Sequence, residues 1–316
     1  MNKQRLVLIF LGMVLLGIGI ITGIFASRIL PFSSSSSPSE FQFINLAVTS
    51  NLNKHFIINF GPLKKELIKI QNKYPQKTYI YFDYLNNASW TGLNERELFV
   101  AASMIKVPLA MSIYKAAEER KFNLEDRYSL EELNMDENFG ELYKVGPDKE
   151  FTIEELIKIM LEQSDNTAAD ALGDVLKNIG INDPFNDVYA FMGWDIFPGI
   201  GETLNYQEIN LKTLSNMFIS LYNAEYINAE NSNKILTFLS NSPFNDKIVA
   251  GVPENIVVSH KIGVSVPNET FSDCGIVYAP NRHYILCLGS NGGDEQKAAE
   301  FMSEISEAVY DYVINN

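Results

Sequence analysis

The sequence predicts an α/β protein of the α+β type, in which one sheet is built from segments far apart in the chain. Three observations support this prediction. Runs of β-branched and aromatic residues lie near both ends, helical periodicity dominates the stretch between them, and the last segment is again helical. Only a sheet shared by the two ends, with helices on its faces, uses all these segments in one core of about 270 residues.

The first elements are a helix and a strand. Apolar residues recur at helical spacing after Pro62, so we expect a helix over 62–74 that ends before Pro75. The run over 78–84 is β-branched and aromatic and predicts a strand. Turn-forming residues fill 85–94, which predicts a hairpin or a loop after this strand.

Helices dominate the middle of the chain, and strands return near its end. Periodicity predicts helices near 103–120, 153–163, 167–179, 211–223 and 229–240. Thr152 and Glu155 form a capping box at the start of the second of these. Short apolar runs between turn residues predict strands over 257–266, 272–279 and 283–290. The closing helix has an apolar face made of Phe301, Met302, Ile305 and Val309.

An uncharged run, Leu6–Ala26, precedes the predicted fold. As a helix rising about 1.5 Å per residue it spans roughly 31 Å, which matches the hydrocarbon core of a bilayer. Lys3 and Arg5 precede this run, so the positive-inside rule places the N-terminus in the cytoplasm. We therefore expect an uncleaved signal anchor, and a cleaved signal peptide is the alternative.

This topology divides the chain into four segments. We expect a cytoplasmic tip over 1–5, a transmembrane signal anchor over 6–26, a Ser/Pro-rich tether over 27–44 and one domain over 45–316. The expected location is the cell membrane, with a single span and an extracytoplasmic domain. Within the span, Gly19 and Gly23 form a GxxxG spacing, which is a weak signal for a transmembrane helix dimer.

Charge and metal-ligand content exclude two classes of partner. The formal net charge is −14, and a sequence-independent grip on nucleic acid needs a cationic surface, so we expect no nucleic acid partner. The histidines and cysteines form no tight cluster with metal-ligand spacing, so we expect no metal and no other cofactor. These residues are His55, His260, His283, Cys274 and Cys287.

Ser103-Met104-Ile105-Lys106 is the first candidate for chemistry. It opens an apolar helix, and an i, i+3 spacing puts the serine and the lysine on one face. A neutral Lys106 there can take the proton of Ser103 and make it a nucleophile. The helix start also favours the negative charge that develops when a carbonyl is attacked. A serine and a lysine three apart also occur by chance about once in a chain of this length.

Two further motifs follow in the chain. Ser164-Asp165-Asn166 comes directly after the capped helix, where a hydroxyl beside an amide suits a proton relay and an amide-binding contact. The alternative is a helix N-cap, since all three residue types are capping residues. Lys261-Ile262-Gly263 lies in a predicted strand, where the glycine allows close approach of a substrate backbone and the lysine sets the local potential.

Together and in this order, the three motifs resemble the S-x-x-K, S-D-N and K-T-G signature of the class A β-lactamases and related penicillin-binding proteins. The resemblance covers roughly residues 45–316. It implies a β-lactamase/transpeptidase-like fold: an antiparallel sheet with flanking terminal helices, an inserted mainly helical domain, and an active site in the cleft between them.

The resemblance also implies a role for each matching residue. Ser103 matches the acylated nucleophile and Lys106 its proton partner, while Ser164 matches the hydroxyl that relays a proton to the leaving nitrogen. Asn166 matches the amide that holds the substrate side chain, and Lys261 the strand lysine. The oxyanion hole is implied to consist of the backbone N–H groups of Ser103 and Val264. Gly263 and Ile262 stand at the substrate-binding positions of the strand motif.

Two positions depart from the family pattern. Ile262 replaces the K-T-G hydroxyl residue, so we expect a weaker grip on a substrate carboxylate. The class A deacylation motif E-x-x-L-N matches Gly201-Glu202-Thr203-Leu204-Asn205 only with Gly201 at the glutamate position. Glu202 is one residue late and is the remaining candidate for the deacylating base. Because the next helix begins by about Asn210, we expect a short loop and no efficient base.

Three functions remain open on these residues. The first is a β-lactamase-like serine hydrolase that opens β-lactam amides through an acyl-Ser103 intermediate. The second is a penicillin-binding D-alanyl-D-alanine peptidase or acyltransferase that acts on peptidoglycan stem peptides and deacylates slowly. The third is a catalytically silent cell-wall-binding domain, which has no need for all of Ser103, Lys106, Ser164 and Lys261.

Three other side chains have plainer interpretations. Cys274 and Cys287 flank a turn at Pro280-Asn281, and they stand opposite each other on antiparallel strands if that turn has an even number of residues centred there. They form either a disulfide or a pair of buried thiols. His260 is expected to pack on the face of its strand that points away from the site.

Overall fold

The computed structural model describes residues 43, 57, 59–193 and 208–316. They belong to one structural unit, Phe41–Asn316. The predicted cytoplasmic tip and signal anchor, the Gly19/Gly23 motif, most of the tether, and Glu202 lie outside the described residues. Within the part that is described, no helix is long and apolar enough to cross a membrane. Phe43, in the predicted tether, is 5% exposed and its ring packs against Tyr278.

Strands from both ends of the chain form the main sheet, as predicted. It has five strands in the order β2-β1-β9-β8-β7, and every neighbouring pair is antiparallel. The N-terminal β1 pairs with the C-terminal β9 along its whole length, from Lys77↔Asn291 to Tyr84↔Tyr284. The bounds are Lys77–Tyr84 for β1, Ser89–Leu93 for β2, Val258–Ser265 for β7, Thr270–Val277 for β8 and Tyr284–Asn291 for β9.

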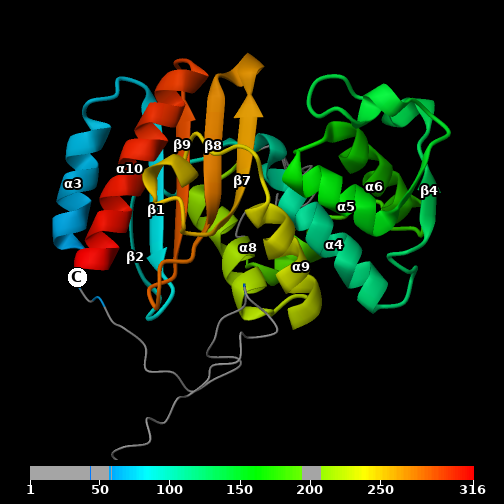
Figure 1. Cartoon of the computed structure of the whole chain (residues 1–316), viewed down its shortest axis with the longest axis horizontal. Coiled ribbons are helices and arrows are strands. Elements are labelled where there is room, and N and C mark those ends of the chain that lie inside the picture. The colour runs from blue at the N-terminus through cyan, green and yellow to red at the C-terminus, as the bar shows by residue number, and fades with distance from the viewer. Residues whose placement is uncertain (1–42, 44–56, 58, 194–207) are drawn as a thin grey trace, which may run out of the picture. The chain divides into compact units, whose positions relative to one another are not determined.

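The first and last helices, α3 (Gly61–Gln71) and α10 (Glu295–Asn315), lie side by side on one face of this sheet (Figure 1). Their apolar faces are buried in one core with the strand side chains that point the same way. The predicted face of the closing helix is confirmed. Its four residues, Phe301, Met302, Ile305 and Val309, are fully buried.

Helices from the middle of the chain cover the other face and extend beyond the β7 edge (Figure 1). Their bounds are Lys106–Glu118 for α4, Ile153–Glu162 for α5, Asn166–Asn178 for α6, Asn186–Phe191 for α7, Leu211–Asn223 for α8 and Ala229–Ser240 for α9. The capping box of Thr152 and Glu155 is confirmed, because each side chain accepts a hydrogen bond from the other's backbone N–H. One boundary differs from prediction: α4 starts at Lys106, and Ser103 lies in a preceding 3-10 turn, η1 (Ala102–Ile105).

The remaining elements are short. Two-stranded pairs join β3 (Phe99–Val100) to β6 (Glu208–Ile209) and β4 (Arg127–Ser129) to β5 (Glu150–Thr152). Further 3-10 turns are η2 (Glu132–Asn134), η3 (Leu142–Val145), η4 (Val249–Gly251) and η5 (Val266–Asn268). The sequence did not predict the two strand pairs, because two or three residues are too few to display an alternating pattern.

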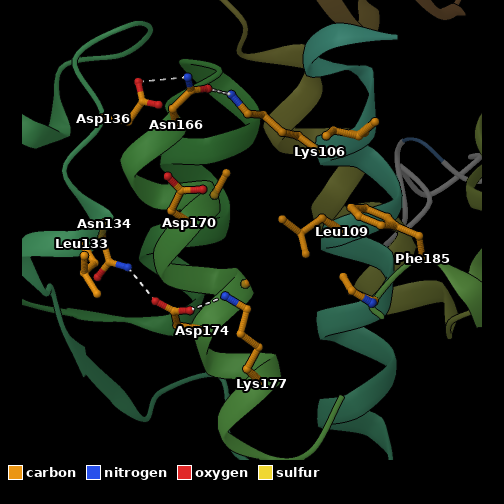
Figure 2. A pocket seen from close by; sticks show the side chains of 14 residues that line it. Lys106, Leu109, Leu133, Asn134, Asp136, Asn166, Asp170, Asp174, Lys177 and Phe185 are labelled. Atoms are coloured by element: carbon orange, nitrogen blue, oxygen red, sulfur yellow. Dashed lines mark hydrogen bonds and ion pairs between the residues drawn. The ribbon is translucent and has the colours of Figure 1, made fainter. Parts of the chain in front are cut away.

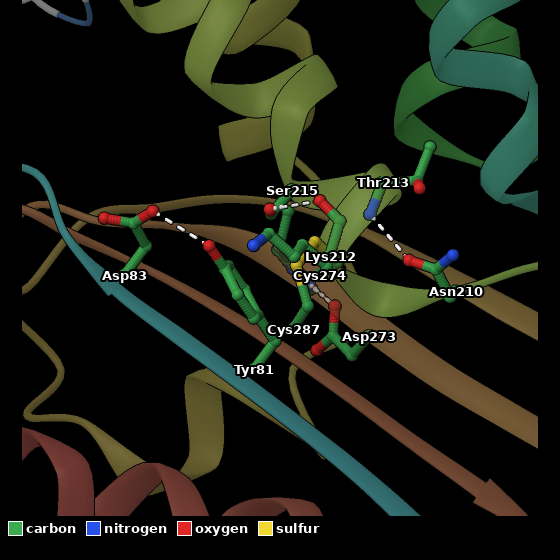
Figure 3. The surroundings of a disulfide bond; sticks show 10 residues. Tyr81, Asp83, Asn210, Lys212, Thr213, Ser215, Asp273, Cys274 and Cys287 are labelled. Carbon is green, nitrogen blue, oxygen red and sulfur yellow. Dashed lines mark hydrogen bonds and ion pairs between the residues drawn. A yellow bond between two sulfur atoms is a disulfide. The ribbon is translucent and has the colours of Figure 1, made fainter. Parts of the chain in front are cut away.

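The two cysteines stand directly opposite each other on β8 and β9 and are joined by a disulfide (Figure 3). Both are fully buried, beneath α8, on the sheet face that the middle helices cover. Of the two states left open by the sequence, the structure therefore has the disulfide.

Candidate active site

Ser103 lies in η1, where β7 runs against this short turn. The residue before it, Ala102, has φ of +47°, a left-handed conformation that costs a non-glycine residue on the order of 1–3 kcal/mol. Such strain persists only where the surrounding structure over-determines the backbone. The serine side chain is half-buried, so it is both held by its backbone and open to one side.

Lys106 extends from the first residue of α4 toward α6 and is 4% exposed. Its Nζ donates to the backbone oxygen of Ser164 at 2.5 Å and to Asn166 Oδ1 at 2.6 Å. Burial lowers the pKa of Lys106 to about 8, against the opposing charges of Asp165, Asp136 and Asp170 in that order. A substantial fraction of this lysine is thus neutral in mildly alkaline solution and able to accept a proton.

The three residues of the Ser164-Asp165-Asn166 turn make different contacts. Asp165 is the N-cap of α6 and accepts from Ala168 N, while its other oxygen accepts from the N–H groups of Glu141 and Leu142. Ser164 has φ of +56° and is fully buried. The N-cap interpretation is confirmed for Asp165, while the side chains of Ser164 and Asn166 contact the two lysines and their predicted roles remain predictions.

Lys261 meets Ser164 from the opposite side. Its Nζ donates to Ser164 Oγ at 2.7 Å and to its neighbouring carbonyl, Ile262 O, at 3.2 Å. Burial and then the positive charge of Lys106 lower the pKa of Lys261 well below its usual value, although Asp273 opposes them. Ser164 thus lies between two lysines, with its carbonyl oxygen on Lys106 and its hydroxyl on Lys261.

Gly263 allows β7 to approach η1. A Cβ at this position would lie 2.7 Å from the carbonyl oxygen of Ala101 and 2.5 Å from Ser272 Oγ, so a larger residue would push the strand away from the turn. The contact lies next to Val264 and two residues before Ser103, whose backbone N–H groups are the two predicted oxyanion donors. Val264 is half-buried.

Ile262 lies on the sheet face opposite Lys261. Its register partner is Asp273, whereas that of Lys261 is Cys274, and directly paired residues share a face. Only 2% of Ile262 is exposed, so it presents neither a hydroxyl nor an accessible apolar surface to the cleft. His260 is on the same face as Ile262, as predicted, where its Nδ1 lies 2.8 Å from Asp273 Oδ1.

Asp136 belongs to the site, although no sequence pattern singled it out. It lies in the loop before α5 and reaches the site from the other side of Asn166: Asn166 Nδ2 donates to Asp136 Oδ1 at 3.2 Å (Figure 2). Since Asn166 Oδ1 accepts from Lys106, the amide is oriented at both ends. A lone aspartate in a loop carries no motif, and only the spatial contact with Asn166 identifies it.

The structure therefore brings together most of the residues predicted from the sequence. Hydrogen bonds link Lys106, Ser164, Asn166 and Lys261 into one network. Ser103 and Gly263 adjoin it through the contact between η1 and β7. Ile262 faces away, and Glu202 lies outside the described residues. The network thus holds residues from all three motifs that resemble the β-lactamase and penicillin-binding class, with Ser164 contacted by both lysines.

Comparison with known proteins agrees with this class. The model of the Beta-lactamase enzyme family (Beta-lactamase2) matches residues 62–313, and the chain belongs to that family. A β-lactamase from Bacteroides uniformis is 26% identical over 238 residues, which cover 69% of this chain and 80% of the relative.

Solved structures share the fold. PBP-A superimposes with a TM-score of 0.73 at 18% identity, covering 84% of this chain and 100% of PBP-A. A mutant of PBP-A, solved as an acyl-enzyme complex with penicillin G, gives a TM-score of 0.71 at 19% identity over 81% of this chain and 97% of its own. A β-lactamase from Sphaerobacter thermophilus gives 0.71 at 20% identity, over 82% and 99%. The β-lactamase-like fold predicted from the motifs is therefore confirmed.

Proposed function

We propose that the protein is a serine hydrolase that opens β-lactam amides through an acyl-Ser103 intermediate. The observation that carries this proposal is the placement of Ser164 between two buried lysines, Lys106 and Lys261, whose pKa values are both lowered. A domain kept only for binding has no need of two buried lysines that, among the described residues, lack an ion-pair partner and lie beside a strained serine turn. A buried lysine and a strained backbone each lower the stability of the fold. A role in catalysis accounts for keeping them.

Acylation begins with proton transfer from Ser103 to neutral Lys106, which lies one helical turn further along the chain. The Ser103 oxygen then bonds to the carbonyl carbon of the β-lactam, and the carbonyl electron pair moves onto its oxygen. The N–H groups of Ser103 and Val264 stabilise that oxyanion. A larger residue at position 263 would increase the distance between these two donors, because only a glycine leaves space for the carbonyl oxygen of Ala101.

Collapse of the oxyanion breaks the carbon–nitrogen bond, and the leaving nitrogen takes a proton. Ser164 supplies that proton from its hydroxyl, and the protonated Lys106, whose Nζ lies against the carbonyl oxygen of the same residue, turns to that hydroxyl and replaces the proton. Lys261 donates to Ser164 Oγ, so its positive charge stabilises the negative charge that develops there during transfer. The proton first taken from Ser103 is thus returned to the product, and the enzyme is left acylated.

Deacylation decides between the two enzymatic functions. Water must attack the acyl-Ser103 ester, and Glu202 is the candidate base in a segment where Gly201 occupies the family's glutamate position. That departure favours the second candidate function, a penicillin-binding peptidase or acyltransferase that acts on peptidoglycan stem peptides and releases its acyl group slowly. Both functions share the acylation machinery, and they differ in the natural substrate and in the lifetime of the acyl-enzyme.

The proposed location is the extracytoplasmic side of the cell membrane. Support comes from the uncharged run Leu6–Ala26 preceded by Lys3 and Arg5, together with the serine-rich segment that follows it. Protease added to intact spheroplasts should digest the domain and leave a short membrane-bound fragment. Protection of the full chain would contradict this topology.

A chromogenic cephalosporin tests the proposed function. Stopped-flow absorbance on the wild-type fragment from about residue 41 should show a burst equal to the enzyme concentration, followed by a slower steady rate. The Ser103→Ala variant should show neither phase. A fast steady rate that collapses in Glu202→Gln would establish an efficient β-lactamase, whereas a burst with almost no turnover would favour the penicillin-binding function. Absence of both phases in the wild type would contradict both enzymatic functions and favour the catalytically silent cell-wall-binding domain.

A further inference from the structure

A groove of about 640 Å³ runs along α6 from the network of Lys106 and Asn166 (Figure 2). Its walls come from α4, α6 and the segments around η2 and the start of α7. Figure 2 shows Asn166, Asp170 and Asp174 following one another along α6, with Lys106 and Leu109 facing them from α4. The groove is within the size range of ligand pockets and shares Lys106 and Asn166 with the proposed site of acylation.

One side of the groove is apolar. Leu109 and Phe185 line it, and Leu133 stands at it with 88% of its surface exposed. An apolar wall beside polar groups suits a ligand with a hydrocarbon part and one charged end.

The other side carries three carboxylates, and their partners differ. Asp136 accepts from Asn166 Nδ2 and from the N–H of Asn138. Asp174 accepts from Asn134 Nδ2 and from Lys177 Nζ, both at 2.8 Å. Among the described residues, the Asp170 carboxylate has no hydrogen-bond or ion-pair partner, although it lies between the other two.

The surroundings of Asp170 favour a cation. Burial and then the negative charge of Asp136 raise the pKa of Asp170, so its charged form is disfavoured until a positive group approaches. Lys106 opposes this effect only in part. A bound metal is not the fitting occupant, because within the described ranges no three acidic, cysteine or histidine side chains are arranged as a ligand set.

We propose that this groove receives the acyl side chain of the substrate and that Asp170 binds an ammonium group carried by that side chain. This inference rests on the proposed function and names the class of substrate for the same site. The spacing agrees with it: Asp170 is four residues beyond Asn166, about 6 Å along the helix. The apolar wall of Leu109 and Phe185 contacts the hydrocarbon part.

Two penicillins that differ by one amino group provide the test. Ampicillin carries an amine on its acyl side chain, and benzylpenicillin carries a hydrogen in its place. The readout is the ratio of their second-order acylation rate constants, measured by competition with a fluorescent penicillin. A ratio cancels any shared effect of a variant on Lys106. We expect the wild-type ratio to favour ampicillin by about threefold, the scale of a single solvent-accessible ion pair.

Charge variants should move this ratio in opposite directions. Asp170→Asn keeps the shape and removes the charge, so the ratio should fall to about one. Lys177→Gln removes the cation that pairs with Asp174, so the ratio should rise. Asp311→Asn, on the exposed side of α10, is the matched control and should leave the ratio unchanged. A wild-type ratio of one, or a preference that survives Asp170→Asn, would overturn the proposal.

Gly173 provides a steric test of the same groove. It lines the groove in the middle of α6, and a Cβ there would meet no atom within 4 Å. Gly173→Trp should therefore fold and fill the groove, and it should lower acylation by ampicillin severalfold relative to Gly173→Ala. Equal rates in the two variants would contradict occupancy of the groove. If neither penicillin acylates any variant, the proposed function fails as well, whereas acylation with an unaltered ratio rejects the groove alone.

Discussion

The two faces of β7 carry two buried ionisable groups in adjacent positions, and their surroundings are opposite. His260 faces α10 and lies 2.8 Å from Asp273, whose second oxygen accepts from the N–H of Ile248. Lys261, one residue later, is on the face that the middle helices cover, and its Nζ donates to the Ser164 hydroxyl and the Ile262 carbonyl. Both are 1% exposed.

This difference indicates a structural role for His260 and a chemical role for Lys261. Asp273 interacts with His260 on β7 through one carboxylate oxygen and accepts from the N–H of Ile248 through the other. These contacts join β7 and β8 to the segment before η4. Gly275, opposite His260 on β8, leaves space for the histidine, since a Cβ at position 275 would lie 2.5 Å from His260 Cβ. Lys261 has no carboxylate partner within the described part of the chain, and an uncompensated buried charge weakens a fold. We infer that Lys261 is retained for reactivity, and that His260 is retained for packing.

The largest expected effect comes from removing the uncompensated charge. Lys261→Met should lower the acylation rate by about 10²- to 10⁴-fold, because Ser164 loses the cation that stabilises proton transfer. The free energy of unfolding should stay equal or rise, since an apolar chain replaces a buried ammonium. Fluorescent-penicillin labelling and urea unfolding measure the two quantities. Retained labelling together with a large loss of stability would reverse the roles assigned to the two faces.

The pH dependence of acylation should be nearly as large. Lys106 acts in its neutral form, and its pKa is lowered to about 8, so the rate falls as pH drops below that value. Between pH 6 and pH 8 the acylation rate constant should rise by up to about a hundredfold, as expected for a base that must lose one proton. A rate that is flat over this range would show that neutral Lys106 is not the base.

On the opposite face of β7, a variant should affect stability and spare the chemistry. Asp273→Ala removes the acceptor of both His260 and the Ile248 N–H, so we expect a loss of about 2–4 kcal/mol in the free energy of unfolding. The acylation rate per folded molecule should change by no more than a few fold. A loss of acylation comparable to that of Lys261→Met, in protein shown to be folded by circular dichroism, would contradict the separation.

The smallest expected effect is an increase in the free energy of unfolding. Gly173→Ala replaces a glycine in the interior of α6 where a Cβ meets open space, so stability should rise by about 1 kcal/mol. Thermal unfolding measures this change. A lower melting temperature would mean that the groove side of α6 is more tightly packed than the structure has it.

Local patterns predicted the elements, and a motif set predicted the fold. Periodicity and the Thr152–Glu155 capping box located the longer helices to within a few residues but missed the six-residue α7, and alternation placed His260 on the correct face. The joint occurrence of three motifs then implied the family. The contacts that shape the site had no such signal, because they depend on packing between elements distant in sequence. The left-handed Ala102, the approach of Gly263 to Ala101 and the position of Asp170 are of this kind.

The central claim is that Ser103 is acylated within this network. Intact-mass spectrometry after mixing with benzylpenicillin tests it most directly, followed by peptide mapping of the adduct. We expect one adduct of the mass of the whole penicillin, located on Ser103, absent from Ser103→Ala and formed far more slowly by Lys106→Met. No adduct on the wild type, or an adduct that persists in Ser103→Ala, would contradict the account.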